Sequence, residues 1–337
     1  MNNEFKYAIV FAGQGAQKEG MGMSLYEASP AARAVFDRAG DGIKFDCFEA
    51  DAERLRQTEV TQPAVYTMDM AAYAALREGL GIGTDFPEPS GTAGFSLGEY
   101  AAFTAAGIID SIETGLQLVR KRSQLMKAAG TNADGSQRGT MAAGMGDPEG
   151  VLALVEKARG DDILEAVNFN SPTQTVVAGD SKAVERFAAL AGEDRSFGVK
   201  AIPLPVSGAF HTPIMLPAAE GFEEFLEDFA FGEPAIPVFL NLTGDTYSEW
   251  VMEGQPAETQ TATDRVKAIM VRQIKSPVQW QRTIEAMASS GIRAIIEVGP
   301  GKTLSGLARK TIPELVTLNV EDADSLEATI KACAQGI

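Results

Sequence analysis

The chain is poor in the residues that most often perform acid–base and redox chemistry. Its 337 residues include one histidine, His211, and two cysteines, Cys47 and Cys333, which lie far apart. The two thiols form no metal-binding or redox spacing, so we expect them to be reduced and incidental. Any reaction that needs a neutral imidazole as its base must use His211. This scarcity makes His211 a candidate catalytic residue before any motif is considered.

Long apolar runs and an excess of basic residues are also missing. No stretch approaches the ~20 consecutive apolar residues that span a bilayer. Residues 1–6 lack the basic start and apolar stretch of a signal peptide. With 29 basic and 46 acidic residues the formal net charge is −17, which disfavours nucleic acid as a partner because phosphates bind basic surfaces. We therefore expect a cytoplasmic protein that binds neither a membrane nor nucleic acid.

The order of apolar runs and helical patterns predicts an α/β fold. Before residue 130 and after residue 205, short apolar runs typical of buried parallel strands alternate with helical patterns. The expected strands cover 7–11, 92–95, 236–240 and 294–298. The expected helices cover 30–39, 62–80, 97–106, 111–129, 217–229 and 265–274, and Thr61 is the expected N-cap of the second. A polar stretch at 244–263 predicts a surface excursion.

The segment from 139 to 205 has a different order of expected strands and helices. Its elements are expected in the order β-α-β-β-α-β, which is the pattern of a ferredoxin-like unit. They cover 140–145, 148–158, 163–168, 175–178, 181–190 and 199–204. We therefore predict a large α/β domain formed by residues 1–138 and 206–337, with a small ferredoxin-like domain, residues 139–205, inserted into it.

Residues 94–98 fit G-x-S-x-G, the nucleophile elbow in which a serine lies on a strained turn between a strand and a helix. The pattern alone is weak, but here an apolar strand precedes it and an alanine-rich helix follows it. The hydroxyl of Ser96 would then lie at a helix N-terminus, which stabilises developing negative charge. Serine needs a base, and His211 is the candidate. A simple helix cap and a structural histidine are the alternative interpretations.

Two other glycine-rich segments match part of a nucleotide-binding motif, and neither match is complete. Residues 13–18 follow the first strand like a dinucleotide fingerprint, but Lys18 stands where the third glycine belongs. Residues 301–303 read Gly-Lys-Thr, but Ile296 stands where a phosphate-binding loop has its first glycine. We therefore expect no nucleotide site of either kind.

The glycine turn after the first strand has a different use in this context. A turn of this kind allows a backbone N–H to approach a reacting oxygen. An oxyanion hole needs two such donors, one of them from the residue that follows the nucleophile. The expected donors are therefore the backbone N–H groups of Leu97 and Gln14.

Seven blocks in the same order resemble the malonyl-CoA:acyl carrier protein transacylases and the acyltransferase domains of fatty-acid and polyketide synthases. The resemblance covers nearly the whole length. The blocks are FAGQGAQ at 11–17, TQPA at 61–64, GFSLGEY at 94–100, VNFNSP at 167–172, GAFH at 208–211, SPVQW at 276–280 and EVGPGK at 297–302. The resemblance implies an α/β-hydrolase-like large domain with an inserted ferredoxin-like domain, in agreement with the pattern above.

The resemblance also implies a site. Ser96 would carry the acyl group with His211 as its base, and Gln14 and Leu97 would be the oxyanion donors. Arg122 would bind the malonyl carboxylate, and the backbone carbonyl of Gln273 would orient the histidine. The Ala-Phe-His form of the histidine block, with Phe210, accompanies malonyl rather than methylmalonyl choice in the polyketide branch. The implied substrate is malonyl-CoA, the implied partner is acyl carrier protein, no cofactor or metal is implied, and a monomer is expected.

Two residues depart from the family pattern. Phe95 stands where a histidine usually precedes the nucleophile, and Ser123 stands where a glycine often follows the arginine. The structural alternative for Arg122 is a solvated helix face shared with Arg120 and Lys121. Two other functions remain open: a serine hydrolase or thioesterase of the α/β-hydrolase type, and a non-catalytic docking subunit of a synthase.

Overall fold

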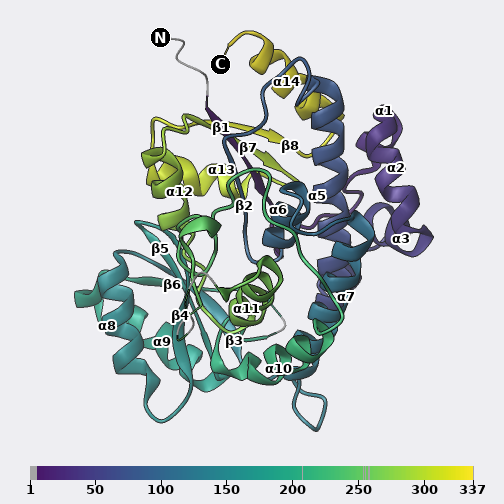
Figure 1. Cartoon of the computed structure of the whole chain (residues 1–337). Coiled ribbons are helices and arrows are strands. Elements are labelled where there is room, and N and C mark those ends of the chain that lie inside the picture. Colours follow the sequence, from purple (N-terminus) through teal and green to yellow (C-terminus); the bar gives the residue numbers. More distant parts are fainter. Residues whose placement is uncertain (1–5, 207, 253, 255, 257–258, 337) are drawn as a thin grey trace.

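The computed structural model describes residues 6–206, 208–252, 254, 256 and 259–336. The structure is mixed α/β and contains two separate four-stranded sheets (Figure 1). In this part of the chain no helix is long and apolar enough to cross a membrane. The two sheets correspond to the two regions that the sequence predicts. Strands from both ends of the chain form a parallel sheet, and strands from its middle form an antiparallel sheet.

The parallel sheet has the strand order β2-β1-β7-β8. Its strands are β1 (Tyr7–Phe11), β2 (Gly91–Gly94), β7 (Ala294–Val298) and β8 (Val316–Val320). The expected strands 7–11 and 294–298 are confirmed, and β2 begins one residue before the expected 92–95. The two central strands are completely buried because helices cover both faces of the sheet.

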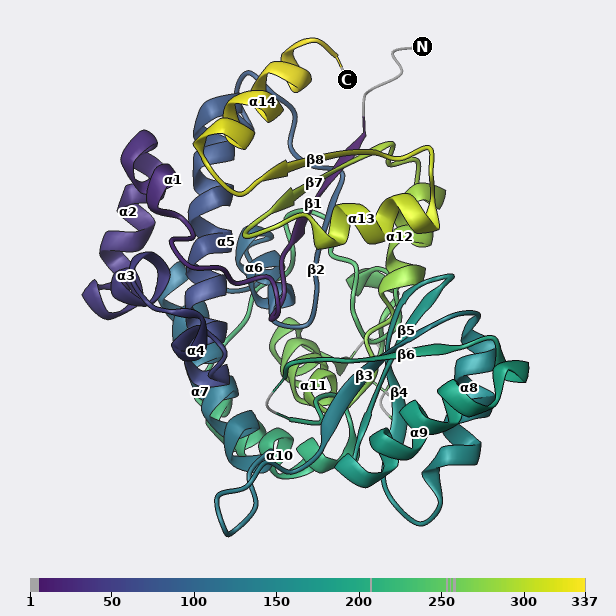
Figure 2. The ribbon, with the colours of Figure 1, turned by 180° about the vertical axis from the view of Figure 1, so that it is seen from behind.

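Side chains alternate between the two faces of this sheet. Ile9 and Phe11 pack with the helices that include α5 (Thr58–Leu80), α6 (Gly98–Ala105) and α7 (Ile112–Ala129). Ala8 and Val10 face the other way, into a smaller core formed with α12 (Trp280–Ser289) and α13 (Thr303–Thr311). The views from the two sides show these two helical layers (Figures 1 and 2).

The antiparallel sheet has the order β4-β5-β3-β6. Its elements are β3 (Thr140–Met145), α8 (Pro148–Arg159), β4 (Leu164–Ser171), β5 (Gln174–Gly179), α9 (Ser181–Glu193) and β6 (Lys200–Pro203). The predicted order β-α-β-β-α-β is therefore confirmed. One face of the sheet packs on α8 and α9 through a separate apolar cluster, and Figure 2 shows these helices on the outside of the molecule.

The remaining helices surround these two sheets. They are α1 (Met23–Ala28), α2 (Pro30–Ala39), α3 (Asp41–Phe48), α4 (Ala52–Leu55), α10 (Leu216–Phe225), α11 (Ala262–Ile274) and α14 (Ala323–Ala334). Three short 3₁₀ turns complete the described elements: Arg195–Phe197, Pro213–Met215 and Tyr247–Glu249. The expected helix 30–39 is confirmed, whereas 217–229 ends four residues early and 265–274 begins three residues early.

The start of the long helix α5 corrects one sequence prediction. Thr61 is not its N-cap, because the helix begins at Thr58 and Gln57 is the cap residue. The backbone N–H groups of Val60 and Thr61 both donate to Gln57 O at 2.8 Å. Pro63 therefore lies in the second turn, where its missing N–H interrupts the helix hydrogen bonds. The error came from placing the proline in the first turn, its commonest position.

For the region after residue 230, the expected strand is wrong and the expected surface excursion is wrong in part. Residues 236–240 form no strand; they join β2 through Pro237 O, which accepts from Thr92 N, and Phe239 N, which donates to Thr92 O. Pro237 has no N–H with which to extend this pairing. The stretch 244–263, parts of which lie outside the described residues, is more than a surface excursion because Tyr247 and Trp250 are buried.

A buried carboxyl group beneath the parallel sheet gives a testable pH dependence. Asp69, on α5, is fully buried, and neither of its carboxyl oxygens has a hydrogen-bond partner among the described residues. Burial and the nearby Glu297 raise the pKa of Asp69 well above its usual value. The folded chain therefore keeps a proton that the unfolded chain releases, so this group makes the protein less stable as pH rises through that interval.

Replacing Asp69 with asparagine should remove this penalty. The melting temperature of Asp69→Asn should exceed that of the native protein, and the difference should grow from pH 5 to pH 8 because the native carboxyl is increasingly held out of its preferred charged state. Thermal unfolding at several pH values measures this. Asp161→Asn, at an exposed position, is the control. A difference that stays constant with pH would contradict the assignment.

Candidate active site

Ser96 lies on a sharp turn between β2 and α6, and its backbone has φ +50°. This left-handed conformation is strained for a residue with a Cβ. The turn requires glycine on both sides of the serine, because side chains at positions 94 and 98 would collide with neighbouring backbone atoms. A Cβ on Gly94 would lie 1.9 Å from Gly98 C, and a Cβ on Gly98 would lie 2.4 Å from Phe11 O. The G-x-S-x-G spacing is thus a steric requirement of this turn.

His211 contacts the serine directly. Its Nε2 lies 2.8 Å from Ser96 Oγ, and its Nδ1 lies 2.9 Å from the backbone oxygen of Gln273. Because a carbonyl can only accept, Nδ1 carries the proton and Nε2 is free to accept the serine hydroxyl. Burial, and then the positive charge of Arg122, lower the pKa of His211 to about 4. The imidazole is therefore neutral at pH 7, as a general base must be.

Like the serine, His211 has a left-handed backbone, with φ +63°. These are the two non-glycine residues with positive φ in the described chain, and their side chains hydrogen-bond each other. Strained backbone of this kind persists where the surroundings force it and is common at functional sites. The sequence places the two residues 115 positions apart, so the fold alone brings them together.

Arg122 extends from α7 into the same site. Its side chain is 1% exposed, so the alternative of a solvated helix face is wrong. Nη2 donates to Ser96 Oγ at 3.0 Å and to Gln273 Oε1 at 3.0 Å, and Nη1 donates to Gln62 Oε1 at 2.8 Å. Burial is the main cause that lowers the pKa of the guanidinium. A buried cation bonded largely to neutral groups is an anion-binding arrangement.

The two expected oxyanion donors lie on the two sides of the elbow. Leu97 is fully buried at the N-cap of α6. The turn that carries Gln14 is pressed against the elbow, because a Cβ on Gly13 would lie 2.5 Å from Phe95 O. Within the described chain, neither the Gln14 N–H nor the Leu97 N–H has a protein acceptor. Both are available to an external oxygen.

Phe95 and Ser123, which depart from the family pattern, and the expected Phe210 pack in apolar surroundings or bond within their own helix. The ring of Phe95 packs edge-on against Trp280, with ring centroids 5.5 Å apart. Ser123 is buried, and its hydroxyl donates to Arg120 O within the same helix. Phe210 is buried in the large core. None of these three side chains hydrogen-bonds Ser96, His211 or Arg122 in the described structure.

Three residues that the sequence interpretation did not assign complete the site. Asn241 Oδ1 accepts from the backbone N of Ser96 at 2.7 Å, and Glu99 accepts from Asn241 and from Gln273. Gln62 joins Arg122 to the oxyanion turn, because its Nε2 also donates to Gln14 Oε1 at 3.2 Å. Glu99 and Gln62 lie inside the matched blocks, and Asn241 interrupts an apolar run. Those were the available signals.

A cleft of about 480 Å³ opens beside the elbow. Its lining includes Gly13, Gln14 and Phe95 from the large-domain side, and Asn168, Asn170 and Val176 from the antiparallel sheet. Asn168 Oδ1 and Asn170 Oδ1 are buried without hydrogen-bond partners in the described chain. Concave sites that combine apolar walls with a few polar side chains are typical of ligand pockets. The cleft can thus receive an elongated ligand beside the glycine turn and Phe95.

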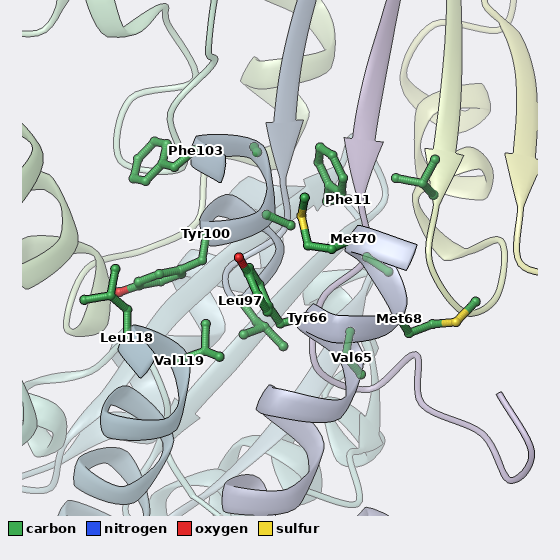
Figure 3. Close-up of a cluster of buried hydrophobic side chains, with 14 of the residues drawn as sticks. Phe11, Val65, Tyr66, Met68, Met70, Leu97, Tyr100, Phe103, Leu118 and Val119 are labelled. Atoms are coloured by element: carbon green, nitrogen blue, oxygen red, sulfur yellow. The ribbon is translucent and has the colours of Figure 1, made fainter. Parts of the chain in front are cut away.

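The elbow rests on one continuous apolar cluster. Leu97, the N-cap residue of α6, and Tyr100 from α6 meet Val65 and Tyr66 from α5 and side chains from α7, as Figure 3 shows. Packing at protein density leaves the strained turn no room to relax. The core therefore fixes the position of the serine, and the polar network fixes its orientation.

The fold and the sequence together define an acyl transferase. The family model for the acyl transferase domain matches residues 8–332, and the chain belongs to this family. Among curated relatives, the malonyl CoA-acyl carrier protein transacylase of Bacillus subtilis is 36% identical over 332 residues, which cover 97% of this chain and 96% of that protein.

Solved structures agree over the same length. The malonyl CoA-acyl carrier protein transacylase of Clostridium perfringens is 34% identical, with a TM-score of 0.84 and 98% of both chains covered. A malonyl-transacylase solved in complex with its type II PKS acyl-carrier protein is 33% identical, with a TM-score of 0.83, covering 97% of this chain and 99% of that one. The resemblance inferred from the seven blocks is therefore confirmed.

Proposed function

We propose that the protein transfers a malonyl group from malonyl-CoA to the phosphopantetheine thiol of acyl carrier protein, through a malonyl ester of Ser96. The observation that carries the proposal is the buried guanidinium of Arg122, 3.0 Å from Ser96 Oγ. A malonyl group on that oxygen has its free carboxylate two carbons beyond the ester carbonyl carbon. It therefore reaches the arginine, which binds carboxylates through two parallel hydrogen bonds.

In the first half-reaction, Ser96 Oγ attacks the thioester carbonyl while its proton passes to His211 Nε2. The carbonyl oxygen becomes an oxyanion stabilised by the N–H groups of Gln14 and Leu97. Collapse of this intermediate breaks the carbon–sulfur bond, and the imidazolium returns its proton to the leaving thiolate. The backbone oxygen of Gln273 holds the ring in the required tautomer throughout.

The second half-reaction reverses the first with a different thiol. The carrier's phosphopantetheine thiol gives its proton to His211 and attacks the malonyl ester. The ester bond to Ser96 breaks, and the serine oxygen takes the proton back from the imidazolium. The cleft beside the elbow, whose lining includes Gln14 and Phe95, suits the pantetheine arm, which both thioesters share. No cofactor or metal takes part in this scheme.

We assign the finer architecture on the same basis. The large domain, residues 1–138 and 206–337, is α/β-hydrolase-like because its parallel sheet carries a serine elbow directly after a strand. The inserted domain, residues 139–205, is ferredoxin-like because its order β4-β5-β3-β6 with two helices on one face follows the split βαβ pattern. A monomer and a cytoplasmic location stay predictions.

Two alternatives make different predictions about the acyl-enzyme. A hydrolase or thioesterase would turn over malonyl-CoA steadily without a carrier. That class presents an acidic residue to its histidine, whereas His211 Nδ1 faces a backbone carbonyl. A docking subunit would form no acyl-enzyme at all, and the complete site argues against it. The arginine favours a transferase for an acidic acyl group over both.

Incubation with malonyl-CoA in the absence of carrier tests the proposal. We expect one equivalent of coenzyme A in a burst, a mass increase of one malonyl group per chain, and peptide mapping to Ser96. Addition of carrier protein bearing phosphopantetheine should discharge the ester, and the same carrier without the prosthetic group should not. Steady hydrolysis without carrier would favour the hydrolase, and absence of an adduct would favour the docking subunit.

A further inference from the structure

Glu99 is a buried carboxylate directly behind the nucleophile, and the mechanism above does not use it. It lies in the first turn of α6 and is 1% exposed. Its Oε1 accepts from Asn241 N at 2.7 Å and from Asn241 Nδ2 at 3.0 Å, and its Oε2 accepts from Gln273 Nε2 at 2.9 Å. An isolated buried carboxylate is costly, so three hydrogen bonds to one carboxylate indicate a specific arrangement.

The two amides that contact Glu99 also hold the serine backbone from both sides. Asn241 Oδ1 accepts from Ser96 N at 2.7 Å, and Gln273 Nε2 donates to Ser96 O at 2.7 Å. Ser96 is the strained residue of the turn, and strain persists only where the surroundings over-determine it. These two amides therefore hold the strained conformation on which the direction of Ser96 Oγ depends.

Glu99 determines which way each amide faces. An amide has one accepting and one donating end, and an ionised carboxylate only accepts. The NH₂ groups of Asn241 and Gln273 must therefore point to Glu99. This leaves Asn241 Oδ1 for Ser96 N–H and Gln273 Oε1 for Arg122 Nη2, at 3.0 Å. A flipped Gln273 would present an NH₂ group to the guanidinium, and two donors repel.

We propose that Glu99 is a positioning residue whose ionised carboxylate orients Asn241 and Gln273, and thereby fixes both the Ser96 backbone and the Arg122 guanidinium for acyl transfer. The inference rests on the proposed function for its substrate. Its consequence is a site that assembles when Glu99 is ionised and loosens when Glu99 is protonated. A protonated carboxyl would bring an O–H among groups that are already donors.

The surroundings of Glu99 place this change near neutral pH. Burial is the largest influence and raises the pKa of Glu99 to about 7, against the hydrogen bonds from Asn241 and Gln273 and the charge of Arg122. The titratable groups that face it in the described structure are Arg122, from α7, and Tyr100, the next residue of α6. Because the pKa of His211 is about 4, the base itself titrates far below this interval.

The rate of malonyl-serine formation should therefore fall below about pH 7 in the native enzyme, with the slope of a single protonation. Glu99→Gln should lose on the order of 10²-fold at pH 8, the effect of misplacing reacting groups by about 1 Å. Its remaining rate should be independent of pH between 8 and 5.5. Glu99→Asp keeps the charge, so it should keep the acid limb at a reduced rate. Glu185→Gln, at an exposed position of α9, is the matched control.

Quenched-flow mass spectrometry of the acyl-enzyme measures these rates, and thermal melts check folding. A native rate that is flat from pH 8 to 5.5, or a Glu99→Gln rate that keeps the acid limb, would overturn the inference. If Glu99→Gln does not fold, the native profile and Glu99→Asp still decide.

A second probe separates this inference from the proposed function. A fluorophosphonate reacts with an activated serine and needs no malonyl recognition. If malonyl-CoA fails to acylate the native enzyme at any pH, the proposed substrate is wrong. Labelling of Ser96 by the fluorophosphonate should still depend on Glu99 and on pH in the same way, and labelling independent of both would overturn the positioning role.

Discussion

Replacing Arg122 with alanine is expected to lower the preference of the enzyme for malonyl over acetyl groups by orders of magnitude. In the native site the guanidinium is completely buried and bonded to Gln62, Gln273 and the serine hydroxyl. A malonyl carboxylate pairs directly with this charge, whereas an acetyl group offers it no hydrogen-bonding partner. Breaking a buried ion pair costs about 3–5 kcal/mol, so kcat/KM for malonyl-CoA should fall roughly 10²–10⁴-fold.

Acetyl transfer should respond in the opposite direction. The substitution removes the buried charge that penalises a neutral acyl group, so kcat/KM for acetyl-CoA should stay level or rise. Measuring both substrates gives the preference ratio, which does not depend on the fraction of active enzyme. Arg120→Ala, two residues earlier on the exposed face of α7, should leave the ratio unchanged. If both rates fall equally in Arg122→Ala, the arginine supports the structure rather than malonate recognition.

Replacing Ser96 with alanine should abolish the acyl-enzyme. Loss of a serine nucleophile in a concerted site costs on the order of 10⁶-fold in kcat, and no other hydroxyl in the site contacts His211 Nε2 in the described structure. Intact-mass measurement after incubation with malonyl-CoA should find the unmodified chain. The fold should persist, because the core beneath the elbow does not contain the hydroxyl.

A glycine at the same position separates the chemistry from the strain. Ser96→Gly should be equally inactive but more stable than Ser96→Ala, because glycine accepts φ +50° without the Cβ penalty, which is about 1–2 kcal/mol. Paired thermal melts of the two variants measure the difference. Equal stability would mean that the elbow relaxes on substitution, and a persistent malonyl adduct in either variant would place the nucleophile elsewhere.

Most of the fold followed from local pattern. The strands at 7–11 and 294–298 are continuous apolar runs, and the helix 30–39 begins with Pro30 directly after Ser29, whose side chain caps it. The six elements between 140 and 204 also followed from the order of apolar runs and helical patterns. The failures have local causes as well. Pro63 lies in the second turn of its helix rather than the first, and Pro237 prevents a strand that the apolar run predicted.

The sequence by itself determined which side chains could do the chemistry. A single histidine, a serine between two glycines and the arginine that the family resemblance implies left few choices, and the structure brings Ser96, His211 and Arg122 together within hydrogen-bond distance. The residues that hold them were not visible in this way. Glu99 lies in a matched block and Asn241 interrupts an apolar run, but an amide or carboxylate acquires its role only from its neighbours.

Only the tertiary structure decided three properties of the site. It buried Arg122, whose helix neighbours Arg120 and Lys121 predicted an exposed face as readily as a buried one. It lowered the pKa of His211 and raised that of Glu99, because a pKa depends on burial and on nearby charges. It also holds the backbone of Ser96 and His211 in the strained left-handed conformation, because the surrounding packed residues leave no room to relax. Sequence pattern records residue types along the chain, whereas burial, charge proximity and strain arise from contacts between residues that are distant in the sequence, such as Ser96 and His211, 115 positions apart.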